Sequence, residues 1–556
     1  MKKVIIGLTL AVAGTMVWAA AKTAPVMGGG SVIVPVAKER SLEKLLSSRY
    51  SRAELAAGTY VGSEFCLSCH TGSIAPDATE WRDTKHAYAL RKPMGMYTLQ
   101  PGKGVLATTV PGATQDDFML GVDFNTQTGT IFDSTKPNAP ILSYDANTDS
   151  YYIQLGPTGL KLLVAATWAG QSAGNGQRYM VRVPVTDTPT GYSNAIYFGP
   201  FSWGGTGYST NTSKWYTGST PKYAPGITTA ALGNTSTGLQ SQNYMNTCMG
   251  CHITGVRKAW QTPAGEYVVN PYPAVLVPEN SPNYPDLDGD GIPDMAGIGC
   301  ESCHGPGSAH ILGGGDPAKI VNPADIVAGP GYPQANQARS AVCLQCHVQV
   351  ASAPTKKWGF PYDEVNNKPF VMSNPPPDLT SYQVFTGGKW PDGWSYVGAR
   401  VDSFKSSAHY QGSHGIACND CHDAHAETQN DAQVRDTITR GGITYTNVNV
   451  DDDSFCMSCH HYPYFVPSAN ITGAMIQNWK APGFDAPIPD NIRDAIETHT
   501  HHPYGAAREL GIGRCTKCHM APTAGHGTIG GLSHTFWPSR PEDTINLATT
   551  PGTGNT

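Results

Sequence analysis

The sequence contains the stretch Ile298-Gly-Cys300-Glu-Ser-Cys303-His304-Gly-Pro-Gly-Ser-Ala-His310. Cysteines three positions apart lie on the same face of a helical turn, and the following histidine lies beside them. The two thiols can therefore bond to the two vinyl groups on one edge of a porphyrin, while the imidazole binds its iron. Cys-x-x-Cys-His is accordingly the pattern of c-type haem attachment. A Gly/Pro turn then directs the chain toward a second histidine, His310.

The pattern occurs seven times and accounts for all 14 cysteines of the 556-residue chain. A disulfide framework or a redox dithiol would not place a histidine after every second cysteine. Zinc sites need matched blocks of four ligands, which these spacings do not supply. The sequence therefore predicts seven haem c groups. The predicted thioether cysteines are Cys66, Cys69, Cys248, Cys251, Cys300, Cys303, Cys343, Cys346, Cys418, Cys421, Cys456, Cys459, Cys515 and Cys518. The predicted proximal iron ligands are His70, His252, His304, His347, His422, His460 and His519.

Eleven of the 18 histidines remain after the proximal ligands are assigned. Histidine is concentrated around the motifs and is absent between His86 and His252, which favours iron ligands over surface residues. We expect bis-histidine coordination, which closes an iron to substrate and keeps its potential low compared with Met/His ligation. The predicted distal ligands are His86, His310, His409, His425, His499, His502 and His534.

The other histidines are less informative. His461 directly follows a proximal histidine, which is an awkward position for a ligand, so a structural role is expected. His414 and His526 lie in Gly-rich loops, and their roles stay open. Within the cluster at 499–502, the sequence leaves open which histidine binds iron.

The composition and the N-terminus restrict the class of protein. Charged residues make up 14% of the chain and the net charge is −6, so no basic surface for nucleic acid is indicated. Lys2 and Lys3 precede an apolar run, and residues 19–21 are all alanine. This is the pattern of a secretory signal peptide, with an uncleaved membrane anchor as the alternative. We expect an exported protein, located in the periplasm or at the outer surface.

The abundance of Gly and Pro, 62 and 43 residues, indicates a loop-rich body in which porphyrin supplies much of the buried apolar area. The predicted fold class is a multihaem cytochrome c, mostly irregular, with short α-helices around the haems and a β-rich haem-free insertion. Alternating stretches at 150–155, 160–164 and 177–183 predict strands of a small sandwich. The predicted divisions are a signal peptide at 1–21, a linker at 22–57, the first haem segment at 58–96, the insertion at 97–235, haems 2–4 at 236–351, a connector at 352–400, and haems 5–7 at 401–556.

A second metal pattern precedes the third haem motif. Asp286, Asp288, Asp290 and Asp294 occupy positions 1, 3, 5 and 9 of a calcium loop, with glycine at position 6 and the Ile292 carbonyl at position 7. Position 12 is glycine instead of the usual glutamate. The sequence predicts Ca²⁺ here, with a solvated acidic turn as the alternative.

Several stretches resemble a family of exported multihaem cytochromes of anaerobic respirers, relatives of the tetrahaem electron acceptor of ammonia oxidation and of octahaem tetrathionate, nitrite and hydroxylamine enzymes. The resemblance covers roughly residues 58–95 and 240–545, and it implies distal roles for His310, His425, His499 and His534. The lysine-ligated motif of pentahaem nitrite reductases is absent, because all seven motifs end in histidine. The stretches that carry the resemblance are Tyr60-Val-Gly-Ser-Glu-Phe-Cys66, Ile298 to His310, Val321-Asn-Pro, Ile416-Ala-Cys418-Asn-Asp-Cys-His422-Asp-Ala-His425, His499-Thr-His-His502, Cys518-His519-Met520-Ala-Pro522, and Ser533-His534-Thr-Phe536 followed by Arg540-Pro-Glu.

These observations predict an electron carrier of anaerobic or extracellular respiration, with seven haems in one chain. One alternative is a reductase in which one haem stays open to nitrite, hydroxylamine or tetrathionate, the first haem beside Lys85 and Tyr88 being the candidate. Another is a filament-forming surface cytochrome. The expected partners are redox proteins: other c-type cytochromes, a quinol-oxidising complex or an outer-membrane conduit. The sequence also permits a homo-oligomer.

Overall fold

A computed structural model gives the fold of most of the chain. The signal peptide predicted at 1–21, part of the linker, His414 and His526 lie outside the residues that the structure describes. The described residues are 23–25, 31–33, 44–71, 78–87, 89–93, 140–145, 147–155, 158–168, 177–203, 215–217, 223–277, 284–348, 350–385, 402–412, 415–426, 428–461, 470–504, 513–525, 528–538 and 542.

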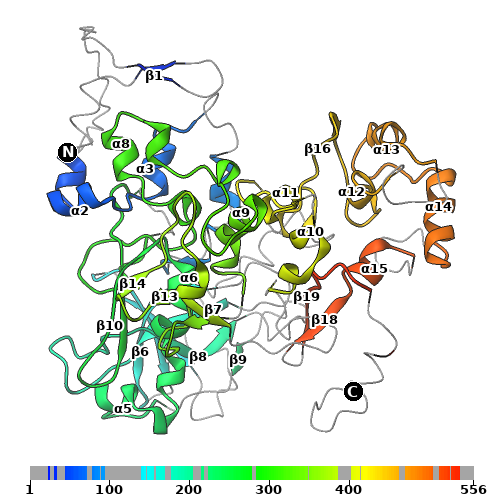
Figure 1. The fold of residues 1–556 in the computed structure, drawn as a ribbon. Coiled ribbons are helices and arrows are strands. Elements are labelled where there is room, and N and C mark those ends of the chain that lie inside the picture. The colour runs from blue at the N-terminus through cyan, green and yellow to red at the C-terminus, as the bar shows by residue number, and fades with distance from the viewer. Residues whose placement is uncertain are drawn as a thin grey trace, which may run out of the picture. The chain divides into compact units, whose positions relative to one another are not determined.

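The chain divides into two compact units. The first comprises Met1–Thr59 and Gly307–Ile320, and it contains helices α2 (Arg52–Ala57) and α8 (Ser308–Leu312), both labelled in Figure 1. The N–H of Thr59 donates to the hydroxyl of Ser308 at 2.8 Å and so ties its two segments together. The second unit, Tyr60–Pro306 with Val321–Thr556, holds all seven Cys-x-x-Cys-His motifs.

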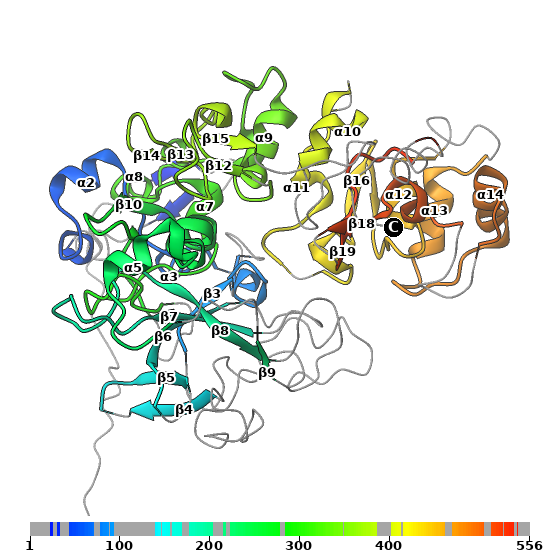
Figure 2. The ribbon, with the colours of Figure 1, turned by 90° about the horizontal axis from the view of Figure 1, so that it is seen from below.

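One seven-stranded antiparallel sheet dominates the first half of the second unit (Figure 2). Its main path is β4-β5-β6-β7-β8-β9, and β3 also pairs with β6. The strands predicted at 150–155, 160–164 and 177–183 are confirmed as β5, β6 and β7. The bounds are β3 (Leu90–Arg91), β4 (Pro140–Asp145), β5 (Ser150–Leu155), β6 (Lys161–Trp168), β7 (Gln177–Arg182), β8 (Tyr197–Trp203) and β9 (Trp215–Thr217).

The expected small sandwich is wrong for the described strands, which form a single sheet in this region. Alternation along β6 buries Leu162, Val164 and Ala166. These side chains belong to one apolar core with Met245, which precedes the second motif, and Met249, which lies within it. The buried face of the sheet therefore packs against a haem-motif segment, and a second sheet is not needed to cover it.

The motifs lie on short helices, as expected. The second motif begins in a π-helical turn, η4 (Met245–Met249), that continues into α6 (Gly250–His252). The other motif helices are α3 (Ser63–Leu67), α7 (Cys300–His304), α9 (Ala335–Leu344), α11 (Cys418–Cys421), α12 (Ser454–Met457) and α15 (Cys515–His519).

The remaining elements connect these helices. The helices are α5 (Thr229–Gly233), α10 (Ala408–Gln411), α13 (Gly473–Lys480) and α14 (Asp490–Thr500). The 3₁₀ turns are η1 (Glu80–Asp83), η2 (Thr235–Thr237), η3 (Gln240–Gln242), η5 (Pro317–Lys319), η6 (Pro323–Asp325), η7 (Leu379–Ser381), η8 (Asp402–Ser406) and η9 (Asp431–Gln433). The paired strands are β1 (Thr23–Pro25) with β2 (Ser31–Ile33), β10 (Val256–Gln261) with β11 (Tyr267–Pro271), β12 (Val350–Ser352) with β15 (Gln383–Phe385), β13 (Tyr362–Asp363) with β14 (Lys368–Pro369), β16 (Ile438–Arg440) with β17 (Ile443–Tyr445), and β18 (Pro522–Gly525) with β19 (Thr528–Leu532). Within the described part of the chain, no helix has the length and apolar character that a membrane crossing requires.

Candidate haem-binding sites

Each motif has the local geometry that haem attachment needs. We number the motifs as sites 1–7 in chain order. In sites 1, 4, 5 and 6 the histidine N–H donates to the carbonyl of the first cysteine at 2.9 Å, which closes one helical turn. This turn holds both cysteines and the histidine on one face. All 14 motif cysteines lie in the described part of the chain, and none of them is in a disulfide that would compete for its thiol.

Five predicted distal histidines lie opposite proximal ones. A metal–imidazole nitrogen bond is about 2 Å long, and adding about 1 Å from each nitrogen to its ring centre places two axial imidazoles roughly 6 Å apart. The observed separations of ring centres match this value. They are 6.1 Å for His86–His347, 6.1 Å for His425–His304, 5.8 Å for His409–His460, 6.3 Å for His534–His422 and 6.5 Å for His499–His519.

The local structure accounts for how these histidines are presented. His86 follows η1, where the indole of Trp81 donates to the Ile298 carbonyl at 3.0 Å and the Ile298 N–H donates to the His86 carbonyl at 2.9 Å. These two hydrogen bonds hold the turn that carries His86 beside the segment that leads into site 3. His499 lies in the last turn of α14, which ends at His501 in a left-handed conformation.

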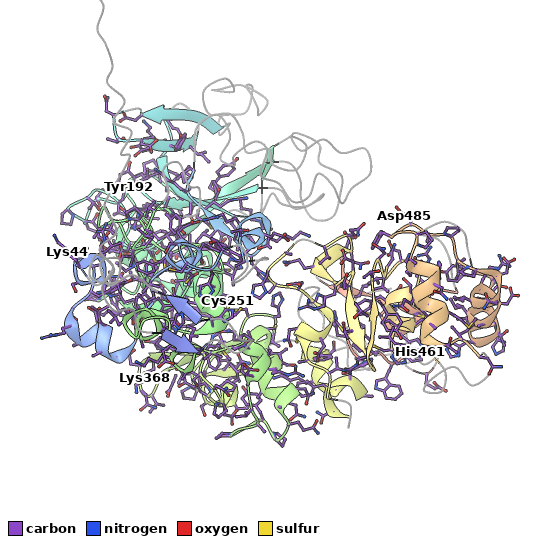
Figure 3. The ribbon with its side chains drawn as sticks, turned by 90° about the horizontal axis from the view of Figure 1, so that it is seen from above. Lys44, Tyr192, Cys251, Lys368, His461 and Asp485 are labelled. Atoms are coloured by element: carbon purple, nitrogen blue, oxygen red, sulfur yellow. The ribbon has the colours of Figure 1, made fainter. Side chains whose placement is uncertain are left out.

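The other histidines are placed differently. His310 lies on α8 in the first unit, and its Nδ1 bonds to the Asp316 carbonyl at 2.9 Å. His502 is exposed. His461 lies beside α12 and α13 (Figure 3), where its Nδ1 is 3.1 Å from the Met457 carbonyl and its ring faces Tyr445.

Burial prepares several of these imidazoles for metal binding. It lowers the pKa of His86 to about 4, with the neighbouring His347 adding to the effect. Burial also lowers the pKa of His460 and of His534 to about 4. Each imidazole is therefore neutral at pH 7 and has a lone pair available for iron, which is the form that a metal requires.

Main-chain carbonyls orient three proximal imidazoles. The Nδ1 atoms of these rings lie 2.8–2.9 Å from a backbone oxygen, which leaves Nε2 for iron. The pairs are His304 with Val321, His422 with Ala432, and His519 with Phe536. Thiols outside disulfides, neutral imidazoles and opposed ring pairs form a donor set that fits haem c.

The first three sites are joined by direct contacts. Buried Glu301 of site 3 accepts from the N–H groups of Val61 and Gly62, which precede site 1, at 2.7–2.9 Å. The thiols of Cys66 and Cys300 interact, which raises the pKa of Cys66 and lowers that of Cys300. Site 2 joins site 3 through Thr254, whose hydroxyl accepts from the Gly299 N–H at 2.8 Å.

The later sites follow in chain order. Sites 3 and 4 are joined by Gln345, whose amide donates to the Ser302 carbonyl at 3.0 Å. Sites 4 and 5 are joined by a contact between the thiols of Cys343 and Cys418, which raises the pKa of Cys343. Burial raises the pKa of Cys421 to about 12, and the nearby Cys459 adds to the effect. Cys421 belongs to site 5 and Cys459 to site 6, so these two sites are close. Sites 6 and 7 are joined by the thiols of Cys456 and Cys515. The seven sites therefore form one connected row, with site 2 as a branch at site 3.

Two aromatic side chains next to the site 2 histidine were not predicted from the sequence. The indole of Trp168 stacks on the His252 ring at 5.5 Å, and the Tyr244 hydroxyl lies 2.7 Å from His252 Nδ1. Burial raises the pKa of Tyr244 well above its ordinary value, so the phenol stays protonated. Tyr244, Cys248 and His252 recur at four-residue spacing, a signal that could have placed the tyrosine on the haem-binding face.

The predicted calcium loop brings acidic groups together. Carboxylate oxygens of Asp286, Asp288 and Asp294 lie within 4.8 Å of one another. Gly291, at position 6, has a φ of +84° and allows the tight turn. Burial and the neighbouring aspartates raise the pKa of Asp294 to about 9. Arg182 of β7 donates to the Leu287 carbonyl at 2.9 Å and so ties the loop to the sheet.

No protein-family model and no curated protein matches the chain. Among solved structures, the chain is similar to an outer cell wall cytochrome, OcwA, with 17% identity, a TM-score of 0.43, and coverage of 88% of this chain and 82% of that one. It is also similar to an undecahaem cytochrome from the S-layer of Carboxydothermus ferrireducens, with 16% identity and a TM-score of 0.31. That match covers 92% of this chain but 56% of the other, so this chain spans just over half of its length.

Proposed function

We propose that the protein is an exported heptahaem c-type cytochrome that carries electrons in anaerobic or extracellular respiration. The observation that carries this proposal is the set of five histidine pairs whose ring centres are 5.8–6.5 Å apart. Haem iron, when bound, supplies the one-electron couple.

The histidine pairs favour a carrier over a reductase. In sites 3–7 the paired imidazoles would hold the iron from both sides, which would leave no place on it for nitrite, hydroxylamine or tetrathionate. The contacts that join neighbouring sites bring their attachment cysteines together, which suits a row of redox centres. The proximal ligands are His70, His252, His304, His347, His422, His460 and His519, and the distal ligands are His86, His310, His409, His425, His499 and His534, with His502 as the less favoured member of its cluster.

The proposal includes a location and a class of partner. The signal peptide pattern at 1–21 supports export to the periplasm or the outer surface. The partners would be redox proteins, such as other c-type cytochromes, a quinol-oxidising complex or an outer-membrane conduit. Among the attachment cysteines only Cys69 of site 1 and Cys518 of site 7 are exposed. These sites are at the ends of the row, where a redox partner can approach.

Haem counting and carbon monoxide binding test the proposal. The purified protein should contain seven haems by pyridine haemochrome assay and mass spectrometry. Sites 3–7 should remain low-spin when the reduced protein is exposed to carbon monoxide. A haem count below seven, or carbon monoxide binding at three or more haems, would contradict it.

We also propose that Ca²⁺ binds the loop Asp286–Asp294. The support is the match to a calcium-loop pattern together with the convergence of three of its carboxylates within 4.8 Å. The ion would hold the loop between sites 2 and 3, where Leu287 is fully buried.

A further inference from the structure

The seven-stranded sheet meets site 2 through aromatic and cationic side chains. Trp168, at the end of β6, stacks on His252 with an interplanar angle of 29°. Phe198 of β8 packs edge-on against Tyr244 at 5.3 Å. The guanidinium of Arg178, on β7, lies 5.1 Å from the ring of Trp168, which itself stacks on His252, and Cys248 of site 2 is also near it. Three neighbouring strands therefore contribute to the surroundings of one site.

Tyr244 makes site 2 chemically different from sites 3, 5 and 7. At those three sites the proximal Nδ1 faces a main-chain carbonyl, whereas at site 2 it faces a phenol oxygen at 2.7 Å. Tyr244 is 1% exposed, so bulk water does not compete for this hydrogen bond. An imidazole that binds iron through Nε2 keeps its proton on Nδ1, and therefore His252 donates to Tyr244.

The acceptor on Nδ1 affects the iron through the imidazole. A hydrogen bond from Nδ1 to a good acceptor makes Nε2 more electron-rich, which stabilises oxidised iron and lowers the reduction potential. A phenol oxygen is a weaker acceptor than an amide carbonyl, because its lone pair is delocalised into the ring. His252 is accordingly a weaker donor to iron than His304, His422 and His519.

Arg178 acts in the same direction. Reduction lowers the positive charge at iron by one unit, so a nearby guanidinium favours the reduced state. We propose that Tyr244 and Arg178 set the reduction potential of site 2 above those of sites 3, 5 and 7, and that the β sheet is the structure that tunes this branch site. This proposal rests on the proposed haem-binding function.

Spectroelectrochemical titration of the intact haem-loaded protein tests the proposal. The phenol lowers the potential less than a carbonyl would, and Tyr244→Phe removes even this weak acceptor, so one haem equivalent should shift to still higher potential. Arg178→Gln removes the charge, so the same equivalent should shift to lower potential, and Arg178→Lys should retain the wild-type value. The matched control is Tyr223→Phe, because Tyr223 is another buried phenol of the same core whose hydroxyl bonds to the Phe198 carbonyl instead of a histidine.

The outcomes separate the tuning proposal from the function on which it rests. An upward shift of one equivalent in Tyr244→Phe and a downward shift in Arg178→Gln, with none in Tyr223→Phe, support the proposal, and shifts in the opposite directions overturn it. Titration curves of Tyr244→Phe and Arg178→Gln that superimpose on the wild type overturn it, as do equal shifts in Tyr244→Phe and the control. Haem content is measured on every variant. A wild-type protein without seven haems instead contradicts the proposed function.

Discussion

The imidazole of His86 lies 6.1 Å from that of His347, with an angle of 85° between the ring planes. His86 follows the first motif, whereas His347 ends the fourth. An iron held at site 4 would therefore be ligated by two segments that are far apart in the chain. The same holds at site 5, where His534 from the C-terminal region faces His422.

Replacing His86 should open site 4. In His86→Ala, the attachment cysteines Cys343 and Cys346 are unchanged, so the haem count should stay at seven. One additional high-spin haem should appear, and one additional equivalent should bind carbon monoxide on reduction. His461→Ala is the control, because His461 bonds to the Met457 carbonyl and faces Tyr445 instead of another histidine. Identical carbon monoxide difference spectra for the wild type and His86→Ala would refute the assignment.

The angles between the paired rings predict two classes of low-spin spectrum. The rings are nearly perpendicular at sites 4 and 6, with angles of 85° and 80°. They are closer to parallel at sites 3, 5 and 7, with angles of 30°, 28° and 12°. Perpendicular imidazoles leave two iron d orbitals almost equal in energy, so electron paramagnetic resonance should show large-gmax signals for two of these haems. The other three should give ordinary rhombic signals, and a single class for all five would contradict the geometry.

Glu266 should make stability depend on pH. It is fully buried, and desolvation raises its pKa although Tyr197 and Asn194 donate to it. An unfolded chain loses this proton near pH 4.3, whereas the folded protein keeps it to higher pH. Stability should therefore fall as the pH rises from about 4.3 to the raised pKa and then level off. Calorimetry should show this slope reduced in Glu266→Gln and retained in the exposed-site control Glu80→Gln. Equal slopes in all three proteins would show that Glu266 does not cause it.

Calcium should stabilise the wild-type protein. Binding to the folded state raises the apparent Tm in proportion to the logarithm of the calcium concentration above the Kd. Asp288→Asn should lose most of this increase and most of the heat measured by titration calorimetry. Asp325→Asn, an exposed aspartate elsewhere in the unit, should behave like the wild type. The absence of any calcium effect on the wild type would contradict calcium binding at this loop.

A side chain at Gly250 should destabilise the protein. A Cβ at this position would overlap the ring of Phe360, which is 1% exposed. Gly250→Ala should therefore cost about 1–3 kcal/mol of stability, the usual range for overpacking a core. Adding Phe360→Leu should recover part of the loss, because the smaller side chain makes room. Additive losses in the double variant would argue against direct contact.

The sequence by itself determined the proposed chemistry of the sites. Thioether attachment depends on residues three positions apart, a distance that one helical turn sets whatever the rest of the fold does. The motifs, their proximal histidines and the strands at 150–155 and 177–182 could therefore be read directly. The calcium pattern is equally local, and three of its aspartates do converge.

Only the tertiary structure decided which histidine faces which. His425 follows site 5 but lies opposite His304 of site 3, and no local spacing contains that information. The sandwich prediction was wrong for the described strands because alternation reveals a buried face but not its partner. That face packs against the segment of site 2. The packing of the whole unit decides which distant segments pair, because the position of each distal histidine depends on contacts between turns that are far apart in the chain.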